Sequence, residues 1–160
     1  MPVRTGWEVV VIPNPAIVAH AFFDAAEHAK TLRKPMTEIV KRASEEIAQN
    51  FAVEGRPQKW KSLAEATIAN RTSEGYPASP ILDRTGALKE AATSPDSWQI
   101  TTGGQATVAA LQVPGYERFH ITGAPNNNMP QRDWSYLDPA FDEYADQVLA
   151  DWVFEPMVAW

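Results

Sequence analysis

Apolar residues recur every three or four positions in three long stretches of the chain, the spacing that places them on one face of an α-helix. The first stretch, 15–29, follows Asn14, a residue type that caps helix N-termini, and it opens with proline. The second covers 35–51, and the third begins at about 138. The predicted apolar faces consist of Ile17, Val18, Ala21, Phe22 and Ala25; of Met36, Ile39, Val40, Ala43, Ile47 and Phe51; and of Phe141, Tyr144, Ala145, Val148, Leu149 and Trp152.

Shorter runs of β-branched and aromatic residues predict strands. One run, W-E-V-V-V-I, lies near the start of the chain at 7–12. Three more come after residue 97: W-Q-I-T, A-T-V-A-A-L-Q-V and R-F-H-I-T. They are separated by Gly-Gly at 103–104 and by Pro-Gly at 114–115, and both pairs favour turns. These three runs are therefore predicted to form an antiparallel meander.

The middle of the chain, 56–80, is rich in turn-forming residues, so we expect it to be mostly irregular with one short helix at about 64–70. Thr85 or Gly86 opens another short helix, A-L-K-E-A-A. Helices followed by strands and then by a helix are typical of an α+β domain. The sequence predicts an N-terminal strand and helices, a small antiparallel sheet and a C-terminal helix. One domain covers 1–160, with an apolar C-terminal extension at about 153–160.

Composition narrows the classes of function. The chain of 160 residues contains no cysteine, which excludes a disulfide framework, a thiolate nucleophile and a thiolate zinc site. A formal charge of −6, from 14 basic and 20 acidic residues, disfavours a protein that grips nucleic-acid phosphates, unless its cations gather on one face. No apolar run reaches the roughly 20 residues of a membrane span, and no signal peptide is recognised. We therefore expect no membrane partner and synthesis in the cytoplasm.

No residue pattern predicts catalysis, since a glycine-rich phosphate loop, a nucleophile elbow and H-E-x-x-H are all missing from the sequence. His20, Asp24 and His28 share a face of the first helix, but ligands spread over two turns span about 12 Å, too far for one ion. We expect these three to be a solvated polar stripe. His120, among apolar neighbours in a predicted strand, is expected to be structural. The prediction is no enzyme, no cofactor and no metal, with a small metal-dependent hydrolase as the alternative.

One dense basic cluster is present, formed by Arg56, Lys59, Trp60 and Lys61. Cations interleaved with an aromatic residue can bind single-stranded nucleic acid by charge and stacking. In an acidic chain, a packed tryptophan or a protein contact is the better interpretation. Single-strand binding is kept as a second alternative.

The last nine residues are apolar for a chain end, with Trp152, Phe154, Met157, Val158 and Trp160. Such surface needs cover, either from the chain's own core or from a partner, because interface cores are enriched in aromatic residues and methionine. Arg132 follows Pro130 in a predicted loop, where its guanidinium can bind a carboxylate of a neighbour or of its own chain. The candidate interface residues are Arg132, Trp152, Phe154, Met157 and Trp160.

Four stretches form a pattern when they are taken in order. Residues 50–67 end a helix and continue as W-K-S-L-A-E-A-T, and 80–91 read P-I-L-D-R-T-G-A-L-K-E-A. Residues 119–123 read F-H-I-T-G, and 129–137 read M-P-Q-R-D-W-S-Y-L. Their order and spacing resemble the virion-morphogenesis or tail-completion family of tailed bacteriophages. The motif positions are Trp60, Leu63, Thr67, Gly86, Leu88, His120, Gly123, Pro130 and Arg132.

The resemblance implies a structural protein that acts at the head–tail junction or at the upper end of the tail. Such a subunit forms a ring with copies of itself and contacts the head–tail connector or adaptor and the tail tube. It implies location in the neck or tail of the virion, after assembly in the host cytoplasm. The genome passes through the ring without sequence-specific binding. The chain departs from the family at Ile121 and Thr122, where glutamine and an aromatic residue are common, so head–tail joining and tail termination both stay open.

Overall fold

The computed structural model describes residues 15–103, 106–124 and 128–158, with side chains from 16 to 155. The predicted α+β class is confirmed, and the strand predicted at 7–12 lies outside the described residues. In chain order the elements are α1 (Pro15–Ala29), α2 (Arg33–Ala52), α3 (Glu65–Ser73), α4 (Ala87–Thr93), the 3₁₀ turn η1 (Pro95–Ser97), β1 (Trp98–Gly103), β2 (Ala106–Leu111), α5 (Arg118–Thr122) and α6 (Ala140–Val158).

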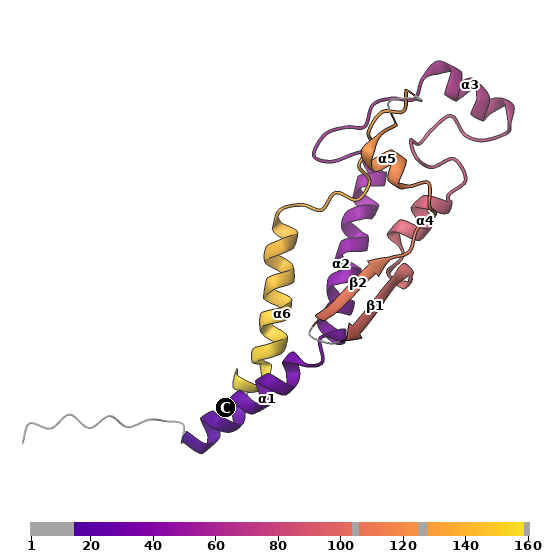
Figure 1. Cartoon of the computed structure of the whole chain (residues 1–160). Helices are drawn as coiled ribbons and strands as arrows, with labels where there is room; N and C mark the ends of the chain where they lie inside the picture. Colours follow the sequence, from indigo (N-terminus) through magenta and orange to yellow (C-terminus); the bar gives the residue numbers. More distant parts are fainter. Residues whose placement is uncertain (1–14, 104–105, 125–127, 159–160) are drawn as a thin grey trace, which may run out of the picture.

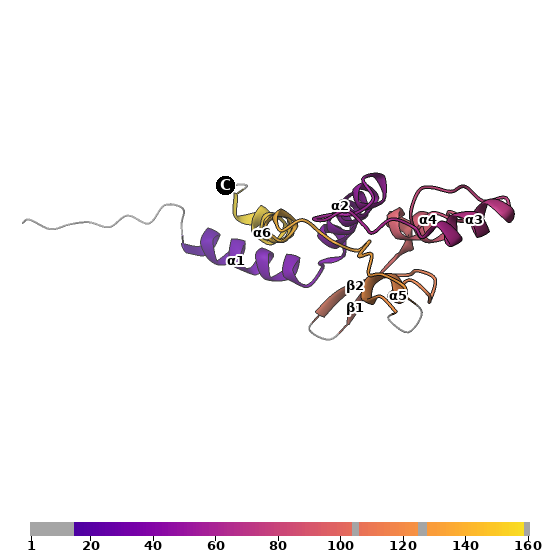
Figure 2. The same cartoon turned by 90° about the horizontal axis from the view of Figure 1, so that it is seen from above.

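The molecule is elongated, and α2 runs along it from one end toward the other (Figure 1). At one end α1 and α6 pack against each other, and α6 also contacts α2. We refer to α1 and α6 together as the helical arm. At the other end lie α3, α4 and α5, and Figure 2 shows the same separation from above. The two ends of the molecule therefore present different surfaces.

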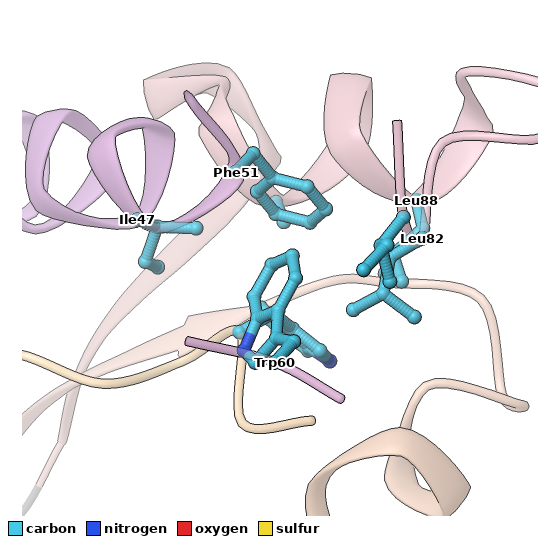
Figure 3. Close-up of a cluster of buried hydrophobic side chains, with 8 residues drawn as sticks. Ile47, Phe51, Trp60, Leu82 and Leu88 are labelled. Atoms are coloured by element: carbon cyan, nitrogen blue, oxygen red, sulfur yellow. The ribbon is translucent and has the colours of Figure 1, made fainter. Parts of the chain in front are cut away.

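The hydrophobic core lies at the C-terminal end of α2 (Figure 3). Its buried side chains are Ile47, Phe51, Trp60, Ile81, Leu82, Leu88, Ala92 and Trp134. The apolar face predicted for α2 supplies Ile47 and Phe51, one helical turn apart. Trp60 stands edge-on to Phe51 with ring centroids 5.7 Å apart, and its Nε1 donates to the carbonyl of Asp133 (3.1 Å). Segments without regular secondary structure thus supply much of this core.

A buried polar network fixes the same region. Asn50 is fully buried, and its Nδ2 donates to the carbonyls of Trp134 (2.9 Å) and Tyr136 (2.7 Å). Its Oδ1 accepts from Arg56 Nε (2.7 Å). The guanidinium of Arg56 also pairs with the buried carboxylate of Glu46, 2.7 Å away. The network ties the loop before α6 to α2.

The sheet is a two-stranded antiparallel hairpin in which Trp98 faces Leu111 and Gly103 faces Ala106. This confirms the first two predicted strands. The third prediction was wrong, because residues 118–122 form the helix α5. A run of five residues is too short to distinguish the strand period from the helix period.

Contacts with the loop that follows hold α5 in place. The backbone N–H of Arg132 donates to the carbonyl of His120 (2.6 Å) and holds the helix against the following loop. Gly123 caps α5 with φ of +74°, and a Cβ there would lie 3.2 Å from the backbone of both Met129 and Gln131. Glycine meets both demands, since it accepts a left-handed φ and needs no space for a side chain.

The other predicted helices are confirmed to within a few residues. Gly86 does begin a helix, as predicted: it is the N-cap of α4, with φ of +81°. The predicted apolar extension continues α6 as far as Val158. The face of α6 predicted to be buried is half-buried at each position from Phe141 to Trp152. A single copy of the chain therefore covers this helix only in part.

Candidate functional site

Seven of the nine motif positions, far apart in the sequence, line one pocket of about 1130 Å³. They are Leu63, Thr67, Gly86, Leu88, His120, Pro130 and Arg132. α3 contributes Thr67 and Asn70, the turn into α4 contributes Gly86, and α5 contributes His120. The pocket thus forms where three short helices and the loop before α6 converge.

The wall of this pocket carries Lys61, Arg71, Arg84 and Arg132, and we refer to it as the cationic pocket. No aspartate or glutamate is among the described residues that line it. This is an unusual concentration of positive charge for a chain with a net charge of −6. A concave, positively charged surface attracts anions, because the low-dielectric walls strengthen the local potential.

Arg132 is 6% exposed, and its guanidinium donates from Nε to the carbonyl of Lys61 (2.9 Å) and from Nη2 to that of Ser62 (3.2 Å). Burial and the neighbouring Arg71 lower the pKa of this guanidinium. From the sequence, the expected partner of Arg132 is a carboxylate, either of a neighbouring subunit or of the same chain. The structure gives it backbone carbonyls, and no carboxylate pairs with it among the described residues. Its role in a subunit contact stays a prediction.

Arg71 was not singled out from the sequence, where it is one polar residue in a short helix. It is 8% exposed and donates from Nη1 to the carbonyl of Pro80 (3.1 Å). No acidic partner of Arg71 is present in the described part of the chain. Arg84 differs, because it pairs with Glu74 and lies over the ring of Tyr76. Arg71 and Arg132, together with the exposed Lys61, therefore carry the charge of the pocket that no carboxylate of the described residues neutralises.

His120 faces the same pocket from α5. Burial lowers its pKa below the ordinary 6.5, and the charges of Arg132 and Arg71 lower it further. Its Nδ1 is buried and makes no hydrogen bond to the described residues. The prediction of a satisfied structural histidine thus fails at this atom.

The other two motif positions are structural. Trp60 belongs to the core, and Gly123 ends α5 where the neighbouring backbone leaves no space for a side chain. Because Trp60 is buried, it cannot stack on a nucleotide base. Arg56 bonds Glu46 and Asn50, and the ammonium of Lys59 donates to the carbonyl of Val53. The basic cluster at 56–61 therefore does not form one nucleic-acid surface, and only Lys61 of this group reaches the cationic pocket.

The metal ligands considered from the sequence do not converge. His20 contacts Asp24 on the exposed side of α1, with Nδ1 and Oδ2 3.2 Å apart. His28 instead stacks on Trp152 of α6, with ring centroids 4.6 Å apart, and its Nδ1 lies 2.9 Å from the carbonyl of Trp152. Within the described residues no group of three such side chains is placed to hold a metal ion.

The candidate interface residues of the C-terminus have different surroundings. Trp152 is half-buried against α1, with the ammonium of Lys34 over its ring at 4.7 Å. Phe154 is 52% exposed, and on α1 Phe22 and Phe23 are 59% and 62% exposed. The side chain of Met157, and all of Trp160, lie outside the described residues. The described helical arm thus displays three phenylalanines to solvent.

A scan against protein-family models and searches of curated proteins and of solved structures found no match for the chain. The resemblance to tail-completion proteins therefore stays a prediction, carried by the four stretches between 50 and 137. None of the described helices is both long enough and apolar enough to cross a membrane.

Proposed function

We propose that this chain is a ring-forming structural subunit of a tailed bacteriophage, acting at the head–tail junction or at the upper end of the tail. Two independent observations support the proposal. Seven of the nine motif positions converge on one pocket, as expected if they serve a common purpose. The helical arm, in addition, leaves aromatic surface uncovered.

The exposed aromatic surface of the arm is the observation that carries the proposal. Phe22, Phe23 and Phe154 are each more than half exposed, on two helices that pack together. Full burial of a phenylalanine contributes about 1.5–3 kcal/mol, so half of that remains to be gained at each residue in a complex. Exposed aromatic residues on packed helices are typical of a subunit contact.

In a ring of identical subunits, each copy uses two different surfaces, one toward each neighbour. An elongated chain with distinct ends is suited to such a heterologous contact. The ring would contact the head–tail connector on one side and the tail tube on the other, with no cofactor and no catalytic step. The protein would be found in the neck or tail of the virion. Closure of the tail tube by a terminator is the closest variant of this function.

The test is to disrupt the gene in the phage that carries it and to image the lysate by electron microscopy. We expect DNA-filled heads separated from tails if the ring joins them, and tails of aberrant length if it terminates them. Intact infectious particles would contradict the proposal in both forms.

Complementation with variants then locates the contact. We expect Phe23→Ser and Phe154→Ser to reduce incorporation into particles while the purified chains melt normally. The matched control is Val108→Ser on β2, an equally exposed apolar residue outside the arm, 56% exposed. Equal incorporation of all three variants would remove the arm from the proposed contact.

A further inference from the structure

We propose that the cationic pocket of one subunit receives the acidic C-terminal half of α6 from a neighbouring copy of the same chain. In this contact the carboxylates of Asp151 and Glu155 meet Arg71, Arg132 and Lys61, and Phe154 packs beside them. The inference rests on the proposed function, because it specifies which two surfaces of the subunit join.

The two buried arginines of the cationic pocket have no carboxylate partner and retain N–H donors for further hydrogen bonds. Arg71 and Arg132 are more than nine-tenths buried, yet their partners are carbonyl groups, which carry no full charge. A guanidinium has five N–H donors, so each arginine keeps donors after these bonds. Bidentate arginine–carboxylate pairs are among the stronger charge-assisted contacts.

The C-terminal part of the chain has the complementary charge. Residues 133–160 contain seven aspartates and glutamates and no lysine, arginine or histidine. Asp151 and Glu155 are exposed and four positions apart, so they lie on one face of α6. No described lysine or arginine pairs with either carboxylate.

The occupant also matches the pocket in its apolar part. The pocket wall includes Leu63, Leu82 and Met129 beside the cations, and such a surface suits an aromatic ring next to two carboxylates. Phe154 is half exposed between Asp151 and Glu155 on α6. A nucleic-acid phosphate would use the cations alone and would meet repulsion from a chain of net charge −6.

The two surfaces lie at opposite ends of the molecule. α3, α4 and α5 surround the pocket at one end, and the C-terminal half of α6 lies beside α1 at the other (Figures 1 and 2). A chain therefore cannot fill its own pocket with this segment in the described conformation. Head-to-tail joining of such ends is a heterologous contact, which closes into a ring when the rotation between copies allows it.

Zero-length cross-linking tests this contact directly. Full-length chain with ordinary nitrogen is mixed with ¹⁵N-labelled chain, treated with a carbodiimide and digested with trypsin. The same treatment is applied to phage particles that contain the protein. We expect Lys61, in peptide 60–71, to be joined to peptide 133–160, which trypsin leaves whole because it contains no lysine or arginine. A cross-linked pair with one ¹⁵N-labelled and one unlabelled peptide identifies a link between two copies. Such mixed pairs distinguish links to Asp151 and Glu155 of another copy from links to the intrachain neighbour Asp133.

Charge reversal supplies the second readout. Lys61 is exposed, so Lys61→Glu is expected to fold normally and to weaken self-association about tenfold or more by placing like charges together. Asp151→Lys together with Glu155→Lys, in a chain that keeps Lys61, is expected to weaken association further, because the new ammonium groups would meet Arg71 and Arg132 as well. Lys61→Arg is the matched control, since it keeps the charge, retains association and abolishes the cross-link.

The outcomes separate the two proposals. Mixed-isotope links, together with weakened association in Lys61→Glu and in the Asp151→Lys, Glu155→Lys chain, support the contact. Rings or particles that form without these links, or that tolerate Lys61→Glu, overturn the pocket contact and leave the proposed function standing. Infectious particles formed without the gene overturn the proposed function itself. An oligonucleotide or inorganic phosphate could instead bind the pocket saturably. If Lys61→Glu abolishes that binding and no mixed-isotope links form, the pocket is a site for that anion, and the proposal that it receives α6 is overturned.

Discussion

Asn50 joins three segments of the fold, so its truncation is a sharp test of how the core is held together. Asn50→Ala removes the two donations to the carbonyls of Trp134 and Tyr136 and the acceptance from Arg56. Those three partners stay behind in a region that excludes water, because Asn50 has 0% exposure. The change acts on the segment that connects the pocket to α6.

The expected cost follows from the three bonds. A neutral hydrogen bond contributes about 1 kcal/mol to stability, and a bond to a charged group about 2 kcal/mol. Loss of two neutral bonds and one charged bond gives a decrease in the free energy of unfolding of about 4 kcal/mol. For a domain of this size, that decrease lowers Tm by roughly 8–16 °C.

Urea unfolding followed by tryptophan fluorescence measures this free energy. Gln49→Ala is the matched control, since Gln49 is the exposed neighbouring amide and accepts one bond from Arg56 (2.9 Å). We expect the control to lose less than about 1 kcal/mol. A loss below about 1 kcal/mol for Asn50→Ala would refute the view that this residue organises the core.

Two further predictions concern a glycine and a histidine. Gly55 has φ of +112°, and a Cβ there would lie 2.6 Å from the carbonyl of Gln58, so we expect Gly55→Ala to lower the unfolding free energy by about 2 kcal/mol or more. Gly75→Ala, with φ of +80° but open space around it, should cost about 1 kcal/mol, and equal losses in urea would contradict the steric argument. For His120, an NMR titration should give a pKa below 6.5. Because the unfolded chain then takes up the proton first, the unfolding free energy should fall as the pH drops below about 6.5, and His120→Gln should lack that component.

Long amphipathic helices could be predicted because their periodicity is repeated several times. α2 shows this, since apolar residues recur on one face from Met36 to Phe51, and its Ile47 and Phe51 enter the core. The five residues of α5 contain no complete repeat, and their aromatic and β-branched side chains favour strand in isolation. The hydrogen bond from Arg132 to His120, a contact between distant segments, holds this helix against the loop that follows it.

The sequence named seven of the residues that line the pocket, but not their common location. The motif positions indicated that Gly86, His120 and Arg132 belong together, but no local pattern places them around one pocket. That arrangement depends on irregular segments between the helices. Arg71 illustrates the limit, because its significance comes from burial and from the missing carboxylate, and neither is encoded by its neighbours in the sequence.

The division between a well-buried core and a half-covered arm has a dynamic consequence. The C-terminal half of α2 is locked by fully buried side chains, whereas α6 has no fully buried residue in its described part. Segments with few buried contacts open locally at lower free energy than the rest of a domain. Backbone amides of α1 and α6 should therefore exchange with solvent deuterium before those at 43–51. A subunit built in this way can separate its arm and repack it on a neighbour while the region around Asn50 stays folded.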